Sequence, residues 1–106
     1  MDAVVIPKDA ARSRLSLDFT WSKIGFDDIM EANFIVKNDS DYSVKDLEIT
    51  CQHTANSGTK IDSNTRTIYE IVKPHSTRRF PKFNMGFIHS QATSSACNIA
   101  DFAISE

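Results

Sequence analysis

The residues of this chain whose types could carry chemistry are two cysteines and three histidines. Cys51 and Cys97 both fall on the apolar side of segments with strand-like alternation. A disulfide between them would close a loop of about 46 residues and stabilise the fold by about 4 kcal/mol on the chain-entropy model. Such a bridge forms in an oxidising compartment. The other interpretation is two separate buried thiols, since cysteine is among the most buried residue types.

Cys51 also lies two positions from His53, and residues i and i+2 of a strand share a face. This Cys51/His53 face suggests a small-ligand or metal-binding function as the alternative to the one favoured below. Structural zinc sites combine two close ligand pairs, and this is the one close pair in the chain. We therefore predict no metal site and no cofactor, and we expect the histidines to be hydrogen-bonded or exposed.

A basic segment with two prolines is the second candidate site. Its members are Lys73, His75, Arg78, Arg79 and Lys82. One interpretation is a solvated sheet edge whose charges prevent strand-to-strand aggregation. The other is a docking patch for an acidic partner protein or for anionic head groups.

Motifs for catalysis and ion binding are absent from the sequence. No serine stands in a Gly-x-Ser-x-Gly turn, and the three glycines are too dispersed to cradle a phosphate. The acidic residues near Asp39 do not match a calcium loop and are explained more simply as turn residues. Asn38-Asp-Ser40 has the letters of a glycosylation sequon, but the same letters favour a hairpin turn. We predict a protein with no catalytic residues that is not an enzyme.

The segments that must position these residues alternate with a period of two. Leu15, Leu17, Phe19 and Trp21 alternate with polar residues, which predicts a half-buried strand. Comparable patterns predict strands over residues 15–21, 30–36, 44–53, 59–62, 65–72, 83–89 and 96–104. Turn signals at regular spacing predict an all-β fold, a single immunoglobulin- or fibronectin-like antiparallel β-sandwich of about seven strands. Residues 1–13 are expected to form a leading arm or edge segment and residues 14–106 the sandwich.

Composition excludes several classes of function. With 41% hydrophobic and 25% charged residues, the chain has the balance of an ordinary globular domain. The net charge of −2 provides no basic field for nucleic acid. No apolar run approaches the ~20 residues of a membrane-spanning helix, so any tether would lie outside this sequence. A periplasmic or other extracytoplasmic location is favoured if a leader or anchor has been removed.

Four segments in the middle of the chain resemble a known family. They read Phe34-x-Val36-x-Asn38-x-Ser40, Val44-Lys-Asp-Leu47-x-Ile49, Ser57-Gly-Thr-Lys-Ile61 and Ile71-x-x-Pro74-x-Ser76-x-x-Phe80. This run is similar to bacterial FxLYD-type, immunoglobulin-like β-sandwich domains. His75 stands where the family has a glycine after the proline. The resemblance implies an envelope-associated accessory domain without catalytic activity, and it carries over no functional residues.

Together these observations predict a non-enzymatic interaction or structural module. Its partner would be another protein, met through loops or through an edge strand. Neither the identity of that partner nor the oligomeric state follows from the sequence.

Overall fold

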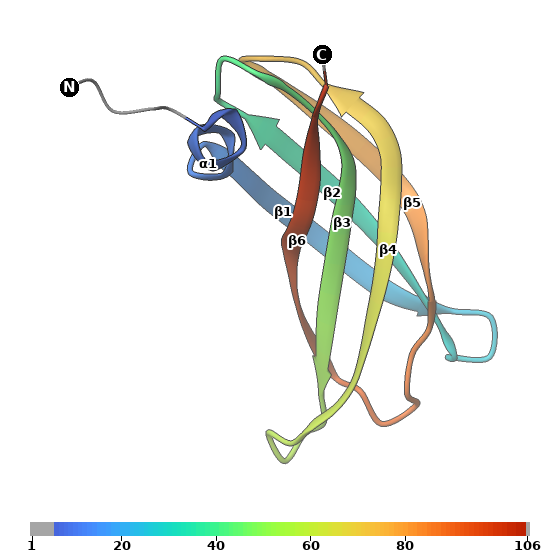
Figure 1. The fold of residues 1–106 in the computed structure, drawn as a ribbon. Helices are drawn as coiled ribbons and strands as arrows, with labels where there is room; N and C mark the ends of the chain where they lie inside the picture. Colours follow the sequence, from blue (N-terminus) through green and yellow to red (C-terminus); the bar gives the residue numbers. More distant parts are fainter. Residues whose placement is uncertain (1–5, 106) are drawn as a thin grey trace.

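A computed structural model describes residues 6–105 of the chain, which form one short helix and two three-stranded antiparallel sheets (Figure 1). The elements are α1 (Pro7–Arg12), β1 (Leu15–Ile24), β2 (Ile29–Asn38), β3 (Ser43–Thr54), β4 (Lys60–Val72), β5 (Ser76–Phe87) and β6 (Ser94–Ser105). The strand orders are β1-β2-β5 in one sheet and β4-β3-β6 in the other. This arrangement confirms the prediction of an all-β, antiparallel fold.

The described residues contain six strands, whereas the sequence predicts about seven. The difference arises at Ser63 and Asn64, which look like a turn between two strands but lie inside β4. Asn64 stays in register opposite Cys51, and its side chain is held by hydrogen bonds on both sides. Ser63 and Asn64 are residue types that favour a turn, but the strand pairing and the hydrogen bonds of Asn64 keep this segment extended.

Strand β5 contains Pro81, which the sequence places between elements. Proline is tolerated in a strand at the edge of a sheet, where its missing N–H has no partner to lose. β5 is such an edge strand, and the irregular pairing there lets the backbone N–H of Lys82 donate to the side-chain oxygen of Asn33.

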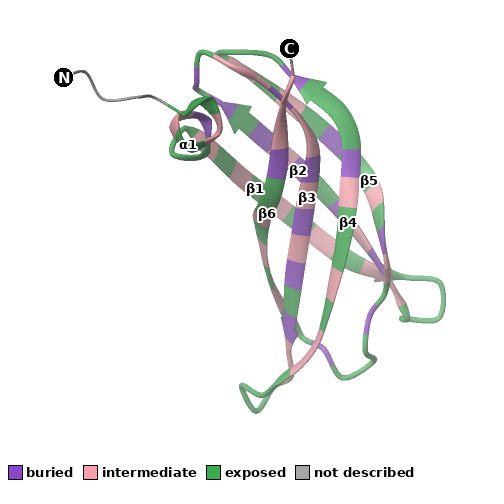
Figure 2. Cartoon of the chain, in the orientation of Figure 1, coloured by how far each residue is buried: buried purple, intermediate pink, exposed green. Residues whose placement is uncertain are grey.

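The two central strands provide most of the core. Inward-facing residues of β2 and β3 are almost fully removed from solvent, because a strand flanks them on each side and a sheet covers them. These residues are Met30, Ala32, Phe34, Val36, Val44, Leu47, Ile49 and Cys51. The inward-facing residues of β1 also pack against the core but remain half-exposed (Figure 2). The core is thus well covered at its centre and thinly covered along β1.

The chain crosses from one sheet to the other directly after Asn38. The buried amide of Asn38 donates to the backbone oxygens of Tyr42, Val72 and Lys73, and its oxygen accepts from Ser40. The segment predicted as a hairpin turn is therefore a connection between sheets. The Asn38 side chain is fully buried and hydrogen-bonded. The residues of the sequon therefore stabilise the connection between the two sheets.

The two long sides of the sandwich differ. Side chains bridge β4 and β5: Arg78 donates to the backbone oxygen of Ile71, and Asn64 donates to that of Phe87. On the opposite side, where β1 and β6 are the edge strands, no hydrogen bond joins the two strands within residues 6–105. The β1–β6 side is the open one.

Helix α1 lies within the predicted leading arm and packs against the end of β6. Lys8 forms an ion pair of 2.7 Å with Asp101, and Arg12 lies over the ring of Phe102. The remaining part of the arm, residues 1–5, lies outside the described residues. Over residues 6–105 no helix has the length and apolarity needed to cross a membrane, in agreement with the sequence.

Candidate functional site

Cys51 and Cys97 form a disulfide, which confirms the first of the two interpretations of these cysteines. They lie directly opposite each other on β3 and β6, in the β4-β3-β6 sheet. Their Cα atoms are 4.0 Å apart, which is the close spacing of a pair whose backbone groups point away from each other. The bridge therefore fastens the outermost strand of this sheet to its central strand.

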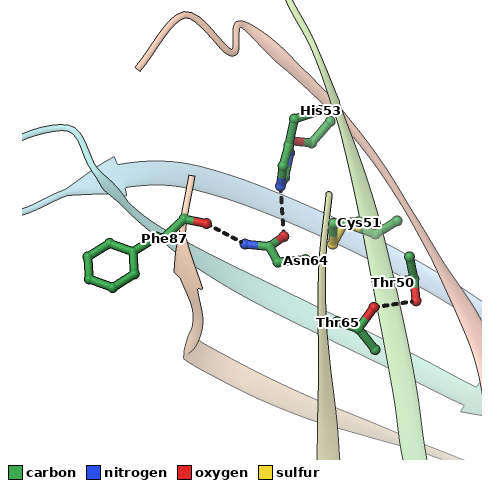
Figure 3. The surroundings of a disulfide bond; sticks show 8 residues. Thr50, Cys51, His53, Asn64, Thr65 and Phe87 are labelled. Atoms are coloured by element: carbon green, nitrogen blue, oxygen red, sulfur yellow. Dashed lines mark hydrogen bonds between the residues drawn. A yellow bond between two sulfur atoms is a disulfide. The ribbon is translucent and has the colours of Figure 1, made fainter. Parts of the chain in front are cut away.

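His53, two residues beyond Cys51 on β3, is fully buried, and both of its ring nitrogens are hydrogen-bonded. Figure 3 shows the bond with Asn64. Nε2 lies 2.7 Å from the side-chain oxygen of Asn64, and Nδ1 lies 2.5 Å from the hydroxyl of Ser95. Asn64 in turn donates to the backbone oxygen of Phe87. Because the Asn64 oxygen only accepts, Nε2 carries the proton and Nδ1 accepts from Ser95.

A serine, a histidine and an asparagine linked by hydrogen bonds also occur in the active sites of enzymes that use a nucleophile. Here the chain of hydrogen bonds runs from β6 through β3 and β4 to the end of β5, and every member has its partner inside the protein. The cleft between β1 and β6, described below, is lined by other residues. The arrangement ties four strands of both sheets together, next to the disulfide.

The donor atoms of the predicted Cys51/His53 face are already bonded within the protein. The sulfur of Cys51 is bonded to Cys97, and both nitrogens of His53 are hydrogen-bonded. Over the described part of the chain, no three His, Cys, Asp or Glu side chains are grouped so that they could hold a metal ion. This face offers no free donor atom to a ligand.

The residues of the predicted docking patch lie in β5 and in the turn that precedes it. His75 lies between two acidic side chains of the β2–β3 connection, with Nε2 2.8 Å from Asp41 and Nδ1 3.4 Å from Asp39. Arg78 lies over the ring of Phe80 and within 3.4 Å of Glu70.

The other three members of the patch are Lys73, Arg79 and Lys82, and all three are exposed. Arg79 points to the opposite face of β5 from Arg78, since successive residues of a strand alternate. The structure thus pairs His75 with acids and places Arg78 and Arg79 on opposite faces of β5.

The acidic neighbours of His75 change its titration. The hydrogen bond with Asp41, followed by that with Asp39, raises the pKa of the imidazole above its usual 6.5, because both favour the charged ring. Next to helix α1, the ammonium of Lys8 holds the pKa of Asp101 below its usual value, mainly through their hydrogen bond. Both His75 and Asp101 are exposed. The ion pairs of His75 link the β4–β5 turn to the β2–β3 connection, and the ion pair of Asp101 links β6 to α1.

The open side of the sandwich carries a cleft of about 240 Å³ between β1 and β6. Its walls are Leu15, Ser16 and Leu17 from β1 and Cys97, Asn98, Ile99 and Phe102 from β6, with Arg12 of α1 at its end. The leucines, Cys97 and Ile99 pack on the core yet stay half-exposed. The cleft is therefore a mixed surface between two sheet edges, with apolar side chains beside the polar Arg12, Ser16 and Asn98.

The edge of β6 also presents unpaired backbone groups. Since the backbone groups of Cys97 point away from Cys51, they point toward the open edge, and the same follows for Ser95 and Ile99 by the alternation of the strand. The N–H and C=O groups of an edge strand can pair with another strand. The sequence did not reveal this site, because strand patterns do not show which strand ends up at an edge. The one indication in the sequence was the alternation of apolar and polar residues from Leu15 to Trp21, which is typical of a half-buried strand.

Searches of the chain against protein-family models, curated proteins and solved structures give no match in any of the three.

Proposed function

We propose that this chain is a non-enzymatic, immunoglobulin-like interaction module that meets another protein chain through the open β1–β6 side. The strand arrangement supports the immunoglobulin-like assignment. β1, β2 and β5 correspond to strands A, B and E of that fold, and β3, β4 and β6 to strands C, C′ and F. In that fold a strand G lies beside F, and within residues 6–105 no strand pairs with the free edge of β6, although α1 packs against the end of that strand.

The observation that carries the proposal is the half-exposed apolar row along this side. The inward residues of β1, from Leu15 to Trp21, pack on the core but are only partly covered. An added strand would cover them and would pair with the free backbone of β6, which is the mode of recognition known as strand addition. Main-chain pairing and apolar burial would then act together.

The FxLYD resemblance and the extracytoplasmic location are part of the same proposal. His75 has φ of 54°, the left-handed conformation that glycine adopts most readily, and it stands where the family has glycine. The Cys51–Cys97 disulfide supports a home in an oxidising compartment such as the bacterial envelope. Neither observation requires a cofactor or a catalytic group.

Photo-crosslinking in intact cells tests the proposal. A photoactivatable phenylalanine analogue would replace Leu17 in the cleft. In a control it would replace Ile71, an apolar residue that is 45% exposed on β4, on the other side of the sandwich. We expect position 17 to give discrete crosslinked protein species that position 71 does not give. Absence of crosslinks at position 17, or the same species at both positions, would contradict the proposal.

A further inference from the structure

We propose that the occupant of the β1–β6 cleft is a second copy of this chain, related to the first by a two-fold axis that passes between Ser16 and Asn98. This inference rests on the proposed function and specifies its partner. Ser16 and Asn98 come from different sheets yet line the same cleft. A two-fold axis placed there would bring β1 beside β1 and β6 beside β6 of the second copy.

The sequence at the start of β1, together with Arg14 in the turn directly before it, is self-complementary about Ser16. It reads Arg14-Leu15-Ser16-Leu17-Asp18, with exposed opposite charges at equal distances from the centre. In an antiparallel pair centred on Ser16, Arg14 lies opposite Asp18 of the second copy, and Asp18 opposite its Arg14. Neither residue forms an ion pair within residues 6–105. Opposite charges on directly opposed strand residues are favourable, and like charges are unfavourable.

The apolar residues beside these charges match in the same register. Leu15 and Leu17 face the core and line the cleft, so each would meet the other leucine of the second copy. Burying half-exposed leucines at the centre of an interface, with charged residues at the rim, is the usual construction of a protein interface.

The edge of β6 is symmetric about Asn98 in a similar way. Small or apolar residues flank it on both sides, in the order Ala96-Cys97-Asn98-Ile99-Ala100. An antiparallel pair centred on Asn98 sets Cys97 opposite Ile99 of the second copy. Both residues have backbone groups directed to the open edge, so they would form a hydrogen-bonded pair. The centres of symmetry in β1 and β6 thus coincide in one cleft.

The four edge strands differ in how they are protected. β4 carries four charged residues, β5 carries three together with Pro81, and β1 carries Asp18 and Lys23. β6 has twelve residues and one charge, Asp101, which is already paired with Lys8. A long edge without charges is a hazard for open-ended aggregation. A two-fold pair closes on itself and covers both copies at once.

Charge reversal tests the inference by measuring oligomeric state over a dilution series with light scattering. Arg14→Asp places two acids opposite each other in both halves of the interface, and Asp18→Arg places two bases there. Each variant should dissociate at a concentration at least about tenfold higher than the unmodified chain, because like charges in an interface are costly. Mixing the two variants restores opposite charges at both positions and should give a mixed dimer.

Arg79→Asp is the matched control, since it makes the same change of charge on the β5 edge and should leave the dimer unchanged. A monomer at every concentration overturns the inference, as does a dimer that is indifferent to both reversals or a mixture that fails to associate. The proposed function has a separate outcome. If position 17 crosslinks to a different protein while the purified chain is monomeric, the interaction module stands and the second copy is excluded.

Discussion

Ser16 of β1 and Asn98 of β6 line the same cleft, so the free edges of the two sheets are open at one place on the molecule. The opposite side of the sandwich is bridged by side chains of β4 and β5. This difference between the two sides decides where another chain can add strands. The disulfide and the hydrogen bond between Ser95 and the buried His53 fasten β6 to β3.

The disulfide should account for a large share of the stability. Reduction of the Cys51–Cys97 bridge is expected to lower the free energy of unfolding by about 4 kcal/mol, because the unfolded chain gains the entropy of an open loop. Denaturant unfolding with and without reductant measures this. The double variant Cys51→Ala/Cys97→Ala should be insensitive to reductant. Equal stability of the unmodified chain under both conditions would contradict the account.

Asn64→Ala tests the hydrogen-bonded chain at His53. The change leaves the Nε2–H group of a fully buried histidine without its acceptor, which should cost about 1–3 kcal/mol of unfolding free energy. The neighbouring Thr65 is exposed and bonds to Thr50 on the other face of the sheet. Thr65→Val should therefore change stability by less than about 0.5 kcal/mol. Equal losses in both variants would show that the buried chain has no special role.

The contribution of the His75 ion pairs to stability should depend on pH. The pKa of His75 is raised in the folded protein, mainly by its hydrogen bond with Asp41, so the folded state binds this proton more tightly than the unfolded state. Its contribution to stability is complete below 6.5, the usual pKa, and is lost as the pH rises through the raised value.

An NMR titration of the His75 ring measures the pKa directly. His75→Asn is the reference for stability, since asparagine tolerates the left-handed backbone and does not titrate. The stability difference between the unmodified chain and this variant should shrink as the pH rises. A His75 pKa at or below 6.5 would be the contrary result.

Gly86 should not accept a side chain. Its φ of 90° is unfavourable for any other residue, and the guanidinium of Arg66 lies against the position a Cβ would take. Gly86→Ala should cost about 1–3 kcal/mol of unfolding free energy. Because Arg66 can move aside, most of this cost should persist in the double variant Arg66→Ala/Gly86→Ala. Full recovery in the double variant would assign the cost to crowding alone.

Sequence patterns predicted the elements of this fold better than their connections. The alternation from Leu15 to Trp21 and from Met30 to Val36 predicted strands that the structure contains. The polar segment after Asn38 predicted a chain reversal, but turn chemistry does not specify which sheet the next strand joins. Only the contacts of the buried Asn38 amide with residues of β4 decide that.

The candidate site was predicted in part. The cysteine bridge was one of two interpretations, and proximity on adjacent strands decides between them. The role of His53 depends on Asn64 and Ser95, which are brought together by the register of three strands. The basic segment from Lys73 to Lys82 looks continuous in sequence, yet the strand pleat and the acids near His75 divide it. Spacing along a chain cannot report these pairings.

The most direct measurement is the hydrogen exchange rate of the Cys97 backbone amide as a function of protein concentration. This amide points to the open edge of β6, and no partner for it lies within residues 6–105. We predict fast exchange in dilute protein, slower exchange as the concentration rises, and no slowing in the Asp18→Arg variant. An exchange rate that is independent of concentration would contradict it.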